Sequence, residues 1–114
     1  MKDDLHVPWS DVAQLISSQS VQNSDGFETV TETPVQICCN WQDGVSQSEF
    51  YLSQKHGMRA SAQVEIHKAD MLLAWPRGTK GDRFVEFENV RYQVLRDFPA
   101  SVDTQMLILT EVIR

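Results

Sequence analysis

Residues that can do chemistry are present in this chain, but their spacing forms no recognisable catalytic motif. The histidines His6, His56 and His67 have none of the spacings typical of zinc ligands. The five glycines are scattered and form no phosphate-binding loop. Three histidines and many serines give chance Ser–His–Asp orders in most chains, so none is assigned here. We therefore predict that the protein is not an enzyme and holds no cofactor or metal.

The two cysteines, Cys38 and Cys39, are adjacent in the sequence. Neighbouring side chains on a strand point to opposite faces, so a disulfide between them requires a strained turn. We expect two reduced, mostly buried thiols in a reducing compartment.

The length and composition are those of a single globular domain. The chain has 114 residues, of which 41% are hydrophobic and 23% charged. No window approaches the roughly 20 apolar residues that span a bilayer. The opening residues MKDDLHVPWSD also lack the basic and apolar regions of a secretory signal. We expect a flexible N-terminal arm over residues 1–11 and one domain over residues 12–114, with no membrane contact.

Charge is unevenly distributed along the chain. Residues 1–50 contain eight acids and one lysine, a net charge of −7, whereas residues 51–114 contain eight acids and nine bases, a net charge of +1. An acidic protein is a poor candidate for wrapping nucleic acid through its phosphates. The asymmetry suits identical subunits that meet front to back, although an ordinary solvated surface also accounts for it.

Alternating apolar residues predict about six short strands. We expect strands at 12–22, 27–41 and 58–68, a hairpin over 83–98 that turns at Glu88 and Asn89, and a final strand at 104–113. The last strand contains four consecutive apolar residues (106–109), which indicates a central strand covered on both faces. The sequence therefore predicts an all-β fold, a small antiparallel barrel or sandwich with a long loop between strands 2 and 3.

Two features interrupt this pattern. Pro34 cannot donate a ladder hydrogen bond, so it marks a sheet edge or a bulge, and we expect free strand edges that other copies can use. Residues 71–82 contain Pro76, Gly78 and Gly81 and are predicted to form a long loop, of which residues 71–75 can pack against the domain.

The connection after the second strand is unusually apolar. Phe50, Tyr51 and Leu52 are consecutive and are flanked by Ser, Gln and Lys. A short helical turn over 48–54, with Ser48 as its N-cap, is one possible local structure. The apolar trio is interpreted either as a contact surface for other subunits or as a cap in which Phe50 and Leu52 cover the chain's own core.

A small barrel could also bind single-stranded nucleic acid. Four aromatic residues could stack on bases, with four basic residues near them in the sequence: Trp75, Phe84, Phe87 and Tyr92, and Lys68, Arg77, Lys80 and Arg83. Aromatic residues at alternating strand positions are more often part of a core, and the bases are few beside the total acidity.

Three segments together resemble the phage head-closure proteins, also called head–tail connector or stopper proteins. They are LISSQSVQNSDGFETVTETPVQICCNW, SQSEFYLSQKHGMRASAQVEIHKAD and RFVEFENVRYQVLRDF followed by QMLILTEV, and the resemblance covers residues 15–112. The order of an opening hairpin, a Ser-Glu-Phe-Tyr connection and a closing hairpin with an apolar strand carries the resemblance. Residues 1–10 and 71–82 are longer than the corresponding segments of the family.

The resemblance implies a structural protein of the virion neck in a tailed phage or prophage, present in the host cytoplasm during assembly. It implies a dodecameric ring of this chain beneath the portal and its adaptor protein, which closes the DNA exit channel after packaging. It also implies a docking surface for a tail completion or terminator protein. Packaged double-stranded DNA would be contacted without sequence specificity. A related possibility is a tail-side joining protein of similar fold.

The resemblance places the channel-closing loop at residues 44–58. The residues implied in closure are Ser48, Glu49, Phe50, Tyr51, Leu52, Lys55, His56 and Gly57. Charge asymmetry adds a hypothesis in which acidic residues of one copy meet basic residues of the next, and the residues assigned to this subunit contact are Glu32, Asp43, Glu49, Arg59 and Lys68.

Overall fold

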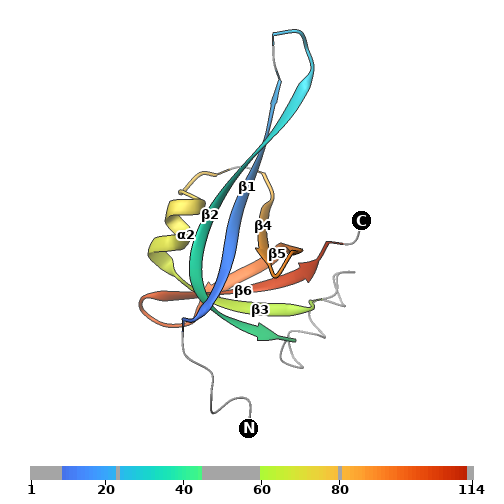
Figure 1. Cartoon of the computed structure of the whole chain (residues 1–114). Coiled ribbons are helices and arrows are strands. Elements are labelled where there is room, and N and C mark those ends of the chain that lie inside the picture. The colour runs from blue at the N-terminus through green and yellow to red at the C-terminus, as the bar shows by residue number, and fades with distance from the viewer. Residues whose placement is uncertain (1–8, 23, 45–59, 80, 113–114) are drawn as a thin grey trace.

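The fold is a closed antiparallel barrel of six strands with one short helix against it (Figure 1). The computed structural model describes residues 9–22, 24–44, 60–79 and 81–112. The elements in chain order are β1 (Asp11–Gln22), β2 (Glu28–Asp43), β3 (Ala62–His67), α2 (Lys68–Ala74), β4 (Arg83–Phe87), β5 (Val90–Pro99) and β6 (Thr104–Glu111). The prediction of a small all-β barrel with a long connection between its second and third strands is confirmed.

The strands follow one another around the barrel in the order β1-β2-β3-β6-β5-β4, and β4 pairs with β1 to close it. The predicted hairpin turn is present, since Glu88 and Asn89 have φ values of 50° and 66° and join β4 to β5. Two successive positive φ values give the turn whose twist matches a hairpin. No helix within the described residues has the length and apolar character needed to cross a bilayer.

Alternate residues of every strand fill the barrel. The buried residues that form its interior are Ala13, Leu15, Ile37, Cys39, Val64, Ile66, Val85, Val94, Leu107 and Leu109. Strand β6 pairs with β3 on one side and β5 on the other, and Leu107, Ile108 and Leu109 are each no more than 1% exposed. The prediction of a central strand covered on both faces is therefore confirmed.

Helix α2 corrects the prediction of a loop from residue 71. Lys68–Ala74 forms a helix, with the backbone N–H of Lys68 donating to the Asp103 carbonyl at 2.9 Å. Seven residues are too few to give a clear helical period, and the nearby Pro76 and Gly78 dominated the sequence pattern. The expected packing of the segment is confirmed, because Ala74 and Trp75 are buried and Met71 packs against the core.

The two ends of the barrel are closed by different aromatic residues. Trp75 is 5% exposed at the end where β4 begins; its indole N–H donates to the Ile16 carbonyl, and Arg83 lies over its ring. At the end where β4 finishes, Trp41 stacks on Phe87 with ring centroids 4.2 Å apart, and Tyr92 lies 4.9 Å from Trp41. These contacts give the barrel two chemically distinct ends.

The prediction of free strand edges is confirmed in part, because the barrel closes but residues 28–39 of β2 pair with β1 alone. Closure pairs β1 with β4, and β2 joins β3 at Asn40–Asp43. Pro34 lies opposite Ile16 in a continuous register, so it marks an edge of β2 and not a bulge. The irregularity of the sheet is in β5, between Val94 and Arg96.

The two thiols differ in burial. Cys39 is fully buried in the core and Cys38 is exposed, so the two side chains point to opposite faces as expected, but the expectation of burial holds for Cys39 alone. Burial raises the pKa of the Cys39 thiol from its ordinary value of 9.0 to about 12, and the charge of Asp11 adds to the effect.

We predict that one thiol reacts in the native protein. A thiol reagent at pH 8 should modify Cys38 rapidly, and Cys39 should react only after unfolding, because a buried thiol with a raised pKa forms little thiolate. Above about pH 9 the unfolded chain loses the Cys39 proton more readily than the folded chain, so stability should fall as the pH rises. The variant Cys38→Ser should be unreactive when folded; equal rates at both thiols would contradict this.

A second prediction concerns the approach of residue 81 to β1. A Cβ placed on Gly81, whose φ is +94°, would lie 2.3 Å from the Ser18 carbonyl oxygen, whereas one on Gly78, whose φ is +86°, would meet nothing within 4 Å. Gly78→Ala should therefore cost only the positive-φ strain, about 1 kcal/mol, and Gly81→Ala about 2–4 kcal/mol. Urea unfolding measures both, and equal losses would show that the close approach does not matter.

Candidate assembly surfaces

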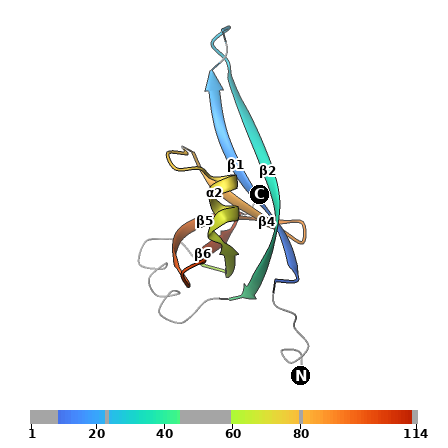
Figure 2. The same cartoon turned by 90° about the vertical axis from the view of Figure 1, so that its left-hand side faces the viewer.

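A two-stranded arm extends well beyond the barrel (Figures 1 and 2). We define the arm as Ser18–Gln22 of β1 and Glu28–Glu32 of β2 with the turn between them, which pair in register from Ser18↔Glu32 to Gln22↔Glu28. The neighbouring strands stop before it, because β4 pairs with β1 only over Gln14–Ser17 and β3 pairs with β2 only over Asn40–Asp43. Five residue pairs at 3.3 Å per residue project roughly 16 Å.

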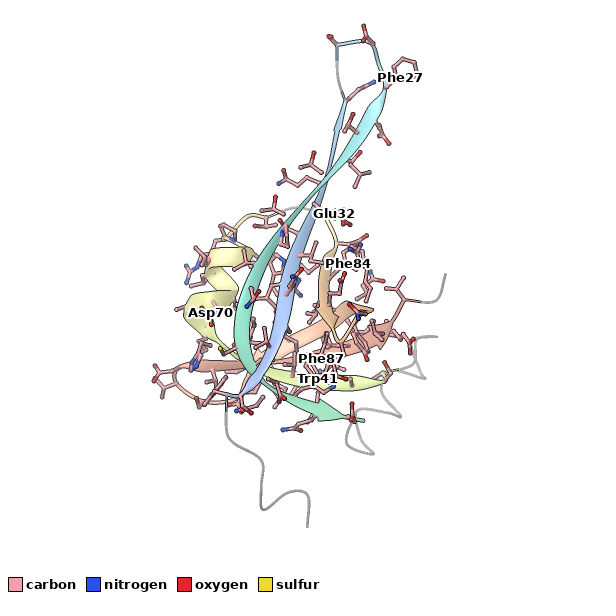
Figure 3. All side chains as sticks on the ribbon, viewed as in Figure 1. Phe27, Glu32, Trp41, Asp70, Phe84 and Phe87 are labelled. Atoms are coloured by element: carbon pink, nitrogen blue, oxygen red, sulfur yellow. The ribbon has the colours of Figure 1, made fainter. Side chains whose placement is uncertain are left out.

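The arm is exposed and acidic. Every residue of Glu28–Pro34 is exposed; Val30 is 63% exposed and Phe27, at the tip, is 70% exposed (Figure 3). Residues 18–32 contain three acids, Asp25, Glu28 and Glu32, and no Lys or Arg. An isolated two-stranded ribbon is marginally stable in water, and exposed strand edges favour pairing or docking. The arm therefore has the composition of a contact element.

The sequence of this arm differs from that of the barrel strands, because its apolar residues do not alternate. Between Ser17 and Thr33 the large apolar residues are Val21, Phe27 and Val30, and they do not alternate along either strand. A strand without an apolar face has nothing to pack on a core. Ser, Thr, Gln and Glu at the other positions could have indicated a hairpin that leaves the barrel.

A salt bridge fixes the base of the arm to the barrel. Arg91 on β5 donates two hydrogen bonds to the Glu32 carboxylate, at 2.7 and 3.0 Å, and lies 3.5 Å from Glu86. Its guanidinium lies 5.4 Å from the Phe84 ring centroid. The hydrogen bond to Glu32 raises the pKa of Arg91. Because β2 and β5 are not neighbours in the barrel, this bidentate pair is a tertiary contact that sets where the arm leaves.

The connection between β2 and β3 is attached at the opposite end of β2. The Gly44 N–H donates to the Ser61 carbonyl at 3.1 Å, and the Ser61 N–H donates to the Leu109 carbonyl at 2.8 Å. Residues 45–59 therefore leave and re-enter the barrel at one rim. Connections longer than about 12–15 residues are uncommon in compact domains and usually have a function.

Three carboxylates lie at this rim, on Asp43 at the end of β2, Glu88 in the β4–β5 turn and Glu111 at the end of β6. Burial raises the pKa of Tyr92, and the negative charges of Glu111, Asp43 and Glu88 raise it further. The Trp41 indole N–H donates to Asp43 at 2.9 Å, so the acidic group is held beside the stacked aromatic residues. The negative charge at this rim opposes close contact with polyanions such as nucleic acids.

Most of the predicted site residues lie outside the described part of the chain. They are Ser48, Glu49, Phe50, Tyr51, Leu52, Lys55, His56, Gly57 and Arg59. The predicted helical turn over 48–54 also lies outside the described residues. The channel-closing role and the contact of Glu49 with Arg59 therefore stay predictions.

The remaining three predicted residues lie far apart. Glu32 is in the arm and Asp43 ends β2, eleven residues later, which corresponds to roughly 36 Å along an extended strand. Lys68 begins α2. Glu32 and Asp43 do not form one continuous acidic surface, and Glu32 already binds Arg91 within its own chain.

The last residues of the predicted N-terminal arm contact the barrel. The Trp9 ring stacks on His67 with centroids 3.9 Å apart, and the Trp9 N–H donates to the Asn40 side-chain oxygen at 2.5 Å. Residues 1–8 are outside the described part of the chain.

The aromatic residues considered for nucleic-acid stacking are occupied within the fold. Trp75 is buried, Phe87 and Tyr92 pack with Trp41, and Phe84 is half-buried beneath Arg91. Arg83, one of the basic residues, pairs with Asp97 at 2.6 Å. Base stacking needs exposed ring faces, so these residues form no such platform.

Within the described residues, no group of three or more His, Cys, Asp or Glu side chains is arranged to hold a metal ion. No model of a known protein family matches this chain, and no curated protein matches it either.

We predict that the salt bridge at the base of the arm contributes measurably to stability. Glu32→Gln and Arg91→Gln should each lower the free energy of unfolding by about 1 kcal/mol, and the double variant should lose less than the sum, because the two residues act as a pair. Amide hydrogen exchange at Thr31 and Thr33 should accelerate in each single variant. Strictly additive losses with unchanged exchange would show that the pair does not hold the arm.

Proposed function

We propose that this chain is a structural head-closure protein of a tailed phage, which assembles as a ring under the portal and its adaptor and closes the DNA exit channel. The observation that carries the proposal is the long connection, residues 45–59, attached at both ends to one rim of a closed barrel. A closed barrel gives a channel-closing segment a fixed base, and fifteen residues are enough to reach into a bore.

The sequence of this connection supports the same role. Phe50, Tyr51 and Leu52 provide an apolar surface that identical copies around a ring can bury against one another. Its Ser and Gln residues permit the change of conformation that a gate requires. The resemblance of residues 15–112 to the head-closure family places the family's closing loop at this position.

The acidic rim fits a channel through which DNA moves. Asp43, Glu88 and Glu111 lie on strand ends and a turn at the end of the barrel that carries the connection, and their negative charges raise the pKa of Tyr92. Carboxylates facing the bore would repel the DNA phosphates and keep packaged DNA from adhering during ejection. In this proposal the protein binds its own copies, the portal adaptor and a tail completion protein, and contacts DNA without sequence specificity.

The test is genetic and uses whole particles. Loss of the gene should yield filled heads that release their DNA and tails that remain unattached, as seen by electron microscopy and by nuclease sensitivity of the packaged genome. Particles that lack the protein, retain their genome and remain infectious would overturn the proposal. Tight, salt-dependent binding of the purified protein to single-stranded DNA would favour the nucleic-acid module instead.

A triple variant tests the apolar trio separately. Replacing Phe50, Tyr51 and Leu52 with Ser should make assembled particles leak DNA while the melting temperature of the isolated protein changes little, because the trio contacts other copies. If Phe50 and Leu52 instead cover the chain's own core, the melting temperature should fall by several degrees. The matched control is Ser46→Thr, Ser53→Thr and Gln54→Asn, which keeps the polar character of the segment and should leave both measurements unchanged.

A further inference from the structure

The arm ends in a tip that combines apolar and negatively charged groups. Phe27 and Val30 are 70% and 63% exposed, and Asp25 and Glu28 lie beside them in the chain. The arm carries net negative charge, since residues 18–32 contain three acids and no Lys or Arg. A complementary surface would have exposed apolar side chains bordered by positive charge.

Helix α2 presents a surface with these properties. Leu72 and Leu73 are 43% and 68% exposed, although their neighbour Ala74 is buried. Lys68 is one helical turn before Leu72, and Arg77 is exposed just after the helix. Asp70 is the single acid between Lys68 and Arg77, so the segment has a net charge of +1. We call Lys68, Leu72, Leu73 and Arg77 the α2 patch.

The arm of one chain cannot cover its own α2 patch. Helix α2 lies beside the part of β2 that belongs to the barrel, and the arm extends away from it (Figures 1 and 2). Bringing the tip back would break the register from Ser18↔Glu32 onward and the bond from Arg91 to Glu32. An arm tip that covers the patch would therefore belong to another molecule.

The geometry points to a contact in which the arm tip of one copy docks on the α2 patch of the next copy. Phe27 and Val30 cover Leu72 and Leu73. Glu28 faces Arg77, and Asp25 faces Lys68. The donor surface and the acceptor surface are different parts of the same chain, so the contact is head to tail. Repetition of such a contact closes into a ring when the rotation allows it.

This inference deepens the proposed function, on which it rests for the presence of many identical copies, and it names the subunit contact of the ring. It assigns the arm to contacts between neighbouring copies. The connection at the opposite end of β2 keeps its proposed role of closing the channel of the ring. The contact shares Lys68 with the charge hypothesis and adds the exposed apolar residues Phe27, Val30, Leu72 and Leu73.

The test detects even weak association between copies. A nitroxide is attached at the arm tip through Ser24→Cys in the Cys38→Ser chain, which is mixed at millimolar concentration with ¹⁵N-labelled chain that carries no nitroxide. Paramagnetic broadening is then measured on the labelled chain. We expect broadening at the amides of Lys68–Ala74, weakening as salt is added. Broadening confined to the arm would indicate arm-to-arm pairing and would overturn the inference, as would no broadening at all.

Matched variants check the two components of the contact. Leu73→Asp in the labelled chain should weaken the association about tenfold, because burial of a leucine side chain is lost, whereas Val12→Asp on β1, at a 49% exposed position, should not. Glu28→Lys in the nitroxide chain and Arg77→Glu in the labelled chain should each weaken it, and their combination should restore it. Absence of rescue would overturn the assignment of Glu28 to Arg77.

The two proposals can fail independently. Broadening at α2 with intact, infectious particles after loss of the gene would retain the contact and reject the head-closure function. Leaking heads with no broadening at α2 would retain the function and reject this contact. Melting temperatures of the variants establish that each one is folded before either conclusion is drawn.

Discussion

The structure depends on the short ladder between β1 and β4. This ladder covers only Gln14–Ser17, yet it closes the barrel and covers the core residues Leu15 and Val85. Strand β1 pairs with β2 along its whole length, so the barrel becomes a two-stranded arm where the pairing of β1 with β4 ends, at Ser17 and Arg83. Trp75 and Gly81 approach the same region through the Ile16 and Ser18 carbonyls. The pairing of β1 with β4 therefore determines both the closure of the barrel and the position at which the arm begins.

Strand β2 connects two ends of the molecule that differ in chemistry. Its first residues form the exposed arm, its middle residues Ile37 and Cys39 are in the core, and its last residues lead into the connection that begins after Gly44. A strand of sixteen residues is longer than a small barrel needs. The extra length separates a surface suited to contacts between copies from a rim suited to a channel. The Glu32–Arg91 pair holds the arm in a defined direction on the otherwise rigid barrel.

Much of the fold could be predicted because residues that are buried on one face of a strand recur at a regular spacing in the sequence. The hairpin at Glu88 and Asn89, the doubly covered strand β6 and the opposite orientation of Cys38 and Cys39 all follow from local alternation and turn chemistry. Helix α2 was missed because seven residues before a proline give too short a pattern. The arm was missed because strand propensity does not say whether a strand has a third strand beside it.

The sequence by itself determined the fold class, the order of the strands along the chain and the position of the long connection, because each depends on neighbouring residues. Only the tertiary structure decided that the barrel closes, that residues 18–32 extend beyond it, and that Glu32 binds Arg91, 59 residues away. Contacts between distant residues depend on strand order and register in space, which no local pattern records. For the same reason Glu32 and Asp43, grouped by charge in the sequence, lie at opposite ends of β2 in the structure.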